Sequence, residues 1–313
     1  MFNPVSLYAR VCLDFIIILF YKLFPGQRRD EVSLDCEHIF KLISNRSIQL
    51  QKADEQLQKV IVTCYFTAKK DPQHGVIRSI ADIRYIAPWY HSVNKLKLNG
   101  IVFYDELPDS FIQQYQTSYV QFRKCTIGDY SIFEERWIIY YLFLKSTTAP
   151  FVFFTDASDV TVNKDPFELD IASGKLFAGR DIANRIWQSS WMMNEIKSFE
   201  TDAHFSFPRP FYYMPVFNAG IVGGKKEPLL ALIAHMIVMT FKTATDHHKD
   251  MVLLNYAIYS QLRPDLKASI FEKKVTDPND DAAASNRYLV TGFPLNSAFK
   301  VFEKNSSAFF SHK

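Results

Sequence analysis

A short apolar run that ends in two aspartates constrains this chain more than any other stretch. The run Phe151–Thr155 follows Pro150, and its residues before Thr155 are all aliphatic or aromatic. Continuous apolarity over so few residues predicts a strand that is buried on both faces of a sheet. Asp156 and Asp159 come next, at the end of the strand where open α/β sheets bind ligands. The stretch predicts either a site for a hard divalent cation or a loop in which the aspartates cap and turn the chain.

Two further apolar runs, Lys59–Phe66 and Ile101–Tyr104, also predict strands. Residues 79–98 and 129–146 carry apolar side chains at spacings of three and four, which predicts helices between the strands. Strands that alternate with helices favour a mostly parallel sheet with helices on both faces. The chain has 313 residues, of which 48% are hydrophobic, so it can bury the core of such an α/β fold.

The most hydrophobic segment is residues 11–24, which carries one acid, one lysine and flanking arginines. It is shorter than the roughly 20 residues that span a bilayer. The segment predicts an interfacial helix on a membrane, a short signal anchor, or a helix packed on the main domain. We favour membrane association, at the Golgi through a type II anchor or at a cytoplasmic membrane face. We expect residues 1–58 to form a hydrophobic segment and a helical lead-in, and residues 59–313 to form the main α/β domain.

Charge, cysteine spacing and glycine content exclude several classes of protein. The net charge of +3 requires no nucleic-acid partner, and we expect none. The four cysteines show no CxxC spacing, so neither a zinc site nor a disulfide framework is indicated. Residues 67–73, the loop after the first strand, lack a glycine-rich phosphate fingerprint. This loop therefore predicts no dinucleotide site or P-loop, although a nucleotide base or ribose could lie there.

Three other positions have both a functional and a structural interpretation. Asn218-Ala219-Gly220 interrupts an apolar strand with residues that let a backbone approach a ligand closely, or that form a bulge. Arg136 lies in the middle of an apolar helical stripe. It is either a surface or salt-bridged arginine or an arginine that reaches a nucleotide. Asp250 opens a predicted helix, where the helix dipole favours a carboxylate even without a function.

Taken together, these stretches resemble the GT-A fold glycosyltransferases that use nucleotide-sugar donors. The similarity rests on residues 60–73, 154–160 and 218–220 and on His312-Lys313, in that order. The two acids have two residues between them, which resembles the collagen-modifying galactosyl- and glucosyltransferases rather than the commoner spacing of one. The resemblance covers roughly residues 59–313. A histidine so near the end of a sequence would otherwise be assigned to a disordered terminus.

The resemblance implies a Rossmann-like GT-A fold and a hexosyl- or related transferase. The donor would be a UDP- or GDP-sugar, and the acceptor a glycan, protein or lipid-linked glycoconjugate. The implied metal ligands are Asp156, Asp159 and His312, and because imidazole suits Mn²⁺ better than Mg²⁺, Mn²⁺ is favoured. The implied donor contacts are Thr63, Phe66, Thr67, Arg136, Asp156, Ser158, Asn218, Ala219, Gly220 and Lys313, with Ser158 near the ribose and Lys313 near the phosphates. Asp250 is the candidate general base if configuration is inverted, whereas a retaining reaction needs no such base.

Three alternatives compete with this interpretation. A haloacid-type phosphatase ends an apolar strand with acids two apart, whereas Asp156 and Asp159 are three apart. A nucleotidyltransferase shares the sheet and paired acids but typically has a glycine-rich first loop. A membrane-associated scaffold would retain a degenerate transferase fold without activity.

Overall fold

The structure is a computed structural model of the chain. It describes residues 43, 46–49, 57–72, 75, 77, 82–169, 176–180, 185–203, 206–243, 249–261, 290–291 and 309–312. Residues 11–24 and most of the predicted lead-in lie outside these ranges, so the division of the chain at residue 58 stays a prediction. Among the helices within these ranges, none combines the length and hydropathy that crossing a membrane requires.

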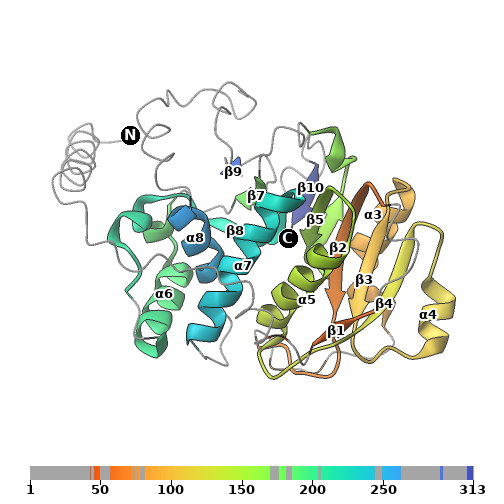
Figure 1. The fold of residues 1–313 in the computed structure, drawn as a ribbon, viewed down its shortest axis with the longest axis horizontal. Coiled ribbons are helices and arrows are strands. Elements are labelled where there is room, and N and C mark those ends of the chain that lie inside the picture. The colour runs from red at the N-terminus through yellow and green to blue at the C-terminus, as the bar shows by residue number, and fades with distance from the viewer. Residues whose placement is uncertain are drawn as a thin grey trace, which may run out of the picture.

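An eight-stranded sheet forms the centre of the molecule (Figure 1), with the strand order β1-β4-β3-β2-β5-β8-β7-β9. The strands are β1 (Ser47–Ile48), β2 (Lys59–Tyr65), β3 (Gly100–Tyr104), β4 (Val120–Thr126), β5 (Phe151–Thr155), β7 (Leu176–Arg180), β8 (Phe217–Lys225) and β9 (Val290–Thr291). Neighbours from β4 to β5 run parallel, whereas β8 runs antiparallel to both β5 and β7. The expected α/β fold with a mostly parallel central sheet is confirmed, with β8 as an antiparallel insertion.

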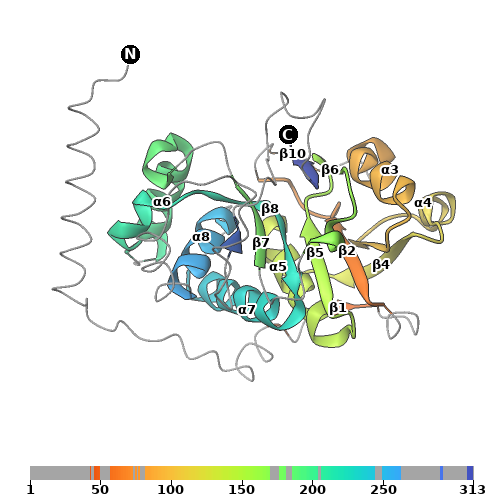
Figure 2. The ribbon, with the colours of Figure 1, turned by 90° about the horizontal axis from the view of Figure 1, so that it is seen from above.

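Helices cover both faces of this sheet, as the strand patterns predict. They are α3 (Ala87–Lys95), α4 (Asp109–Tyr115), α5 (Ile132–Ser146), α6 (Ser190–Ala203), α7 (Lys226–Thr243) and α8 (Asp250–Gln261). Figure 2 shows α7 and α3 on opposite sides of the strands. Side chains alternate between the two resulting cores, so that Val60 and Val62 of β2 pack with α5 and α7, whereas Ile61 packs with α3.

The first predicted helix is shorter than expected. Residues 79–98 carry helical spacing, but α3 spans only Ala87–Lys95. Pro88 lies in its first turn, where proline's fixed φ favours a helix start and its missing N–H costs nothing. β1 lies before residue 59 and pairs with β4, so the sheet includes residues of the predicted lead-in.

Candidate metal and donor site

A two-stranded sheet outside the main sheet brings the end of the sequence to the acidic motif. β10 (Phe310–His312) pairs antiparallel with β6 (Val160–Val162), and the register places His312 opposite Val160. Because β6 begins one residue after Asp159, this pairing sets the imidazole beside the carboxylate. Phe310 is fully buried, and its ring centroid lies 5.3 Å from that of Phe153 in β5. Figure 2 shows β10 alongside β6.

Asp156, Asp159 and His312 form the one group within the described part of the chain that could hold a metal ion. One ligand atom from each residue lies within 4.8 Å of the other two. The His312 Nε2 atom lies 3.0 Å from Asp159 Oδ2 and 3.7 Å from Asp156 Oδ2. Two carboxylates and one imidazole suit Mn²⁺, which accepts a nitrogen ligand among oxygens, better than Mg²⁺, which prefers oxygen and water.

Gly220 of β8 provides the close backbone approach that the sequence suggests. A Cβ atom at this position would lie 2.5 Å from His312 Cε1 and 2.7 Å from Asp156 Oδ2. The Asp156 N–H donates to the Gly220 carbonyl at 2.8 Å, and the Gly220 N–H donates to Asn218 Oδ1 at 2.6 Å. The side chains of Asp156 and His312 therefore pack directly against the backbone of Gly220. This close packing fits a site in which both residues bind one small cation.

The electrostatics favour an ionised acid at the centre of this group. Burial alone would raise the pKa of Asp159, but the hydrogen bond and charge of His312 outweigh that effect, with help from Arg136. The pKa of Asp159 consequently lies below its ordinary value. Ser158 is half-buried, and its hydroxyl donates to Asp159 Oδ1 at 3.4 Å. A charged carboxylate is the form that binds a cation.

Arg136 of α5 is salt-bridged, which is one of the two interpretations that its position in the sequence allows. Its Nη1 donates to Asp156 Oδ1, and its Nη2 donates to Asp250 Oδ2 at the first turn of α8. Burial lowers the pKa of the guanidinium, but the charge and hydrogen bond of Asp250, together with Tyr140 and Cys64, outweigh that effect, so the pKa lies above its ordinary value. One guanidinium thus connects the acidic motif to α8.

Two buried acids beside Arg136 also fix the site, and the sequence analysis missed them. Glu134 Oε1 accepts the backbone N–H of Lys249 at 2.8 Å, which holds the residue directly before Asp250. Glu135 forms a buried ion pair with Arg46 at 2.8 Å. Three consecutive charged residues in an otherwise apolar helix were the signal that could have identified them, because buried charges need partners.

The predicted donor contacts of the first strand are buried in the structure. Thr63 is completely buried, and its hydroxyl donates to a backbone carbonyl of β5 at 2.8 Å. Phe66 is 2% exposed and belongs to the core between the sheet and α5. The Thr67 N–H and hydroxyl both donate to Asp105. Ala68, Lys70 and Pro72 are the exposed residues in the described part of this loop, so donor contacts by the side chains of Thr63, Phe66 and Thr67 stay predictions.

The remaining predicted residues have mixed placements. Asn218 is half-buried at the site, and Ala219 is buried with its N–H 3.1 Å from Met251 Sδ of α8. Asp250 is completely buried in its ion pair, so its role as a base stays a prediction. Lys313 lies outside the described residues.

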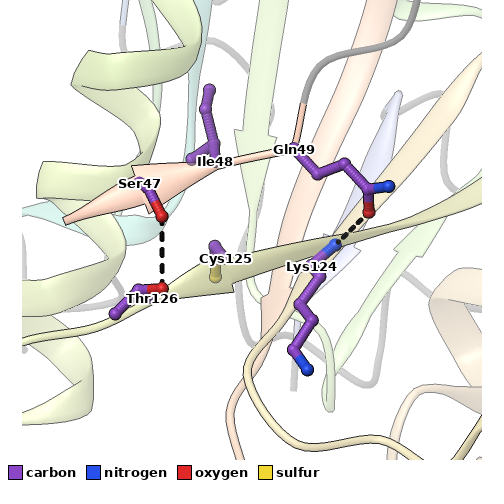
Figure 3. Close-up of a pocket in the computed structure, with 6 residues that line it drawn as sticks. All are labelled: Ser47, Ile48, Gln49, Lys124, Cys125 and Thr126. Atoms are coloured by element: carbon purple, nitrogen blue, oxygen red, sulfur yellow. Dashed lines mark hydrogen bonds between the residues drawn. The ribbon is translucent and has the colours of Figure 1, made fainter.

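A separate concavity lies at the far edge of the sheet (Figure 3). It has a volume of about 330 Å³ and is lined by Ser47, Ile48, Gln49, Lys124, Cys125 and Thr126 of β1, β4 and the residue after β1. None of these six residues belongs to the Asp156 group. β3 and β2 lie between this edge and β5, so the concavity is not part of the candidate site.

Comparisons with known proteins leave the family open. No family model matches the chain, and no curated protein sequence matches it. The glycosyltransferase GlyE of Streptococcus pneumoniae TIGR4 is similar at 17% identity, covering 70% of this chain and 50% of that chain, with a TM-score of 0.37. Its apo form gives 17% identity, 69% and 50% coverage, and a TM-score of 0.40. The match spans about half of those chains, and a likeness this low does not assign a function to this chain.

Proposed function

We propose that this chain is a metal-dependent glycosyltransferase that takes a sugar from a nucleotide-sugar donor. The observation that carries the proposal is the convergence of Asp156, Asp159 and His312 at the carboxyl ends of parallel strands. That edge is where α/β sheets bind nucleotides. A cation held by these three residues would neutralise the charge that develops on a departing nucleoside diphosphate.

The chain's other residues would hold and position the donor around this group. Arg136 fixes the orientation of Asp156, and the missing side chain of Gly220 lets Asp156 and His312 pack against its backbone. Ser158 would reach the ribose, and Lys313 would add positive charge near the phosphates. Asp250 would act as general base in an inverting reaction only after its ion pair with Arg136 opens, because its carboxylate is buried.

The donor class we propose is a UDP- or GDP-hexose, and the acceptor class is a glycan or glycoconjugate. A panel of these donors with Mn²⁺, scored for sugar release to water and for transfer to oligosaccharides, tests the reaction. Sugar release that stops with chelator and returns with Mn²⁺ supports the proposal. A chain that neither hydrolyses nor transfers from any donor in the panel would contradict it.

A second candidate, a non-catalytic scaffold, is favoured by one observation. Arg136 already neutralises Asp156 in this arrangement, which a degenerate site could retain without a metal. Calorimetric titration with UDP or GDP separates the two functions, since a scaffold has no Mn²⁺-dependent nucleotide affinity. A nucleotidyltransferase would instead release pyrophosphate from UTP or GTP when given a sugar phosphate.

We also propose that residues 11–24 attach the protein to a membrane, at the Golgi or at a cytoplasmic membrane face. The apolar character of this segment and its flanking arginines support the proposal. Reporters fused at each end of the chain would reveal which side each end faces. A chain that stays entirely unattached to membranes in fractionation would contradict it.

A further inference from the structure

Asp105 directly follows β3, and its carboxylate accepts hydrogen bonds from the loop after β2 and from the residue after Asp105 itself. Its Oδ1 accepts from the Thr67 N–H at 2.8 Å, from the Thr67 hydroxyl at 3.1 Å and from the Glu106 N–H at 2.8 Å. Its Oδ2 accepts from the Ala68 N–H at 2.9 Å and shares the Thr67 N–H at 3.1 Å. The residue is 6% exposed, so the carboxylate is a buried acceptor that holds Thr67 and Ala68 in one shape.

The loop that Asp105 holds lies at the same edge of the sheet as the candidate metal ligands. β2 is parallel to both β3 and β5. The pair Tyr65↔Tyr104 aligns the carboxyl ends of β2 and β3, whereas the pair Val62↔Phe154 shows that β5 ends two residues before β2. The residues after β2 therefore lie just beyond the end of β5, at the edge that carries Asp156. A donor whose diphosphate meets Asp156 would extend its nucleoside across this edge of the sheet.

A lysine fixes the other side of the same loop. The Lys69 ammonium donates to the carbonyl of Tyr130 at 2.6 Å and to that of Gly128. These carbonyls belong to the segment that leads into α5, the helix that carries Arg136. Between the two attachments the loop exposes Ala68, whose small side chain leaves the backbone accessible to a ligand.

We propose that Asp105 is a positioning residue for the nucleoside of the donor. The inference rests on the proposed function, because it assigns the Thr67–Lys69 loop as the wall that receives the nucleotide. An alternative is that Asp105 merely stabilises a surface loop. A buried carboxylate with several charge-assisted hydrogen bonds preorganises the loop before binding, so the ligand does not have to order it. Its effect should therefore fall on nucleotide affinity and leave metal affinity unchanged.

The substitution Asp105→Asn separates these roles with little change in volume. It replaces one acceptor oxygen by an amide that faces N–H donors, whichever way the amide is turned. Thr67→Val removes only the hydroxyl contact and keeps both backbone contacts. Asp82→Asn is the matched control, because the Asp82 carboxylate also caps the chain, accepting from the backbone N–H of Arg84 at 2.9 Å, at a half-buried position.

The test is calorimetric titration of the four proteins with Mn²⁺ alone, and with UDP or GDP in saturating Mn²⁺. We expect Asp105→Asn to weaken nucleotide binding by about tenfold and Thr67→Val by about threefold, with no change for Asp82→Asn. The affinity for Mn²⁺ alone should stay within about twofold in all four proteins. Hydrogen exchange should accelerate at the Thr67 and Ala68 amides in the Asp105 variant.

Each other result contradicts the inference. Wild-type nucleotide affinity in Asp105→Asn, despite faster exchange at Ala68, would leave only a loop-stabilising role. An equal loss of Mn²⁺ affinity would place the effect at the metal ligands instead. If Asp105→Asn does not fold, unchanged nucleotide affinity in Thr67→Val overturns the inference. A wild-type protein without Mn²⁺-dependent nucleotide binding would overturn the proposed function itself, and this inference with it.

Discussion

The His312 Nε2 atom lies 3.0 Å from Asp159 Oδ2, although 153 positions separate the two residues. This contact completes the candidate metal-ligand group, which neither segment provides alone. Its formation depends on the pairing of β10 with β6 and on the backbone of Gly220, and both features can be altered separately.

Removing a ligand should abolish metal-dependent activity and leave the fold intact. We expect Asp159→Ala, and separately deletion of His312-Lys313, to lower sugar transfer by at least about 100-fold, because a cation keeps too few ligands. Activity assays across Mn²⁺ concentrations measure the effect, and circular dichroism measures the fold. Asp109→Ala, at an exposed acid in α4, is the control. Normal turnover by the truncated protein in chelator would exclude a metal role.

Phe310→Ala should weaken Mn²⁺ binding although the residue does not touch the ligands. Truncating a buried phenylalanine costs about 3–5 kcal/mol, and here that cost falls on the docking of the short strand β10. We expect the Mn²⁺ dissociation constant to rise by at least about tenfold. Phe309→Ala, at a half-buried neighbour, should have a smaller effect. Equal Mn²⁺ affinity in the two variants would show that docking of β10 does not limit binding.

Gly220→Ala should disrupt the ligand cluster. The added Cβ would lie 2.5 Å from His312 and 2.7 Å from Asp156, well inside van der Waals contact. We expect a loss of Mn²⁺ affinity of about tenfold or more. Gly179→Ala is the matched control, because its Cβ would meet its nearest neighbours at 3.7 Å. If both substitutions behave alike in Mn²⁺ titration, crowding at Gly220 is not important.

Arg136→Gln should destabilise the fold as well as the site. It leaves the buried carboxylate of Asp250 without the guanidinium that neutralises it, and loss of one partner of a buried pair costs about 3–5 kcal/mol. Urea denaturation measures this loss. Adding Asp250→Asn should restore part of the stability, because the uncompensated charge disappears. A double variant as unstable as the sum of the two single variants would indicate that the residues are not coupled.

The thiols of Cys64 and Cys125 should resist alkylation in the native protein. Burial raises the pKa of both thiols, so below the raised values they stay protonated, and the reactive thiolate is scarce at pH 8. Iodoacetamide at pH 8, followed by peptide mass spectrometry, should modify both residues slowly in buffer and rapidly in urea. Fast labelling of either residue in buffer would contradict the raised pKa values.

The strands with strong local signals were predictable from the sequence. β5 spans Phe151–Thr155 as expected, because Pro150 and the aspartates bound a continuous apolar run. β4 was missed because polar residues interrupt its apolar ones, and because the charged Arg123 occupies a buried position next to the buried Phe122, which breaks the alternation. The antiparallel placement of β8 depends on pairing between distant strands, which local patterns do not specify.

The site was predictable to a similar extent. Asp156 and Asp159 were predictable as candidate metal ligands because they directly follow a buried strand. Local sequence rules, by contrast, assign His312 to a disordered terminus. Only the family resemblance predicted that His312 is a metal ligand. Thr63 lies within β2 and Phe66 directly follows its last residue, Tyr65, and the side chains of both are buried. The ion pairs of Glu134 and Glu135 depend on partners that are distant in the sequence.

The distance along the chain between Asp159 and His312 has a consequence for synthesis of the protein. A ribosome adds about 5–20 residues per second, so a nascent chain carries both aspartates for many seconds before the histidine exists. During that interval Arg136, which lies upstream of both, is already present as a counter-charge for Asp156. The order of residues therefore supplies the counter-charge of Asp156 early, and completes the candidate metal group only after β10 has emerged.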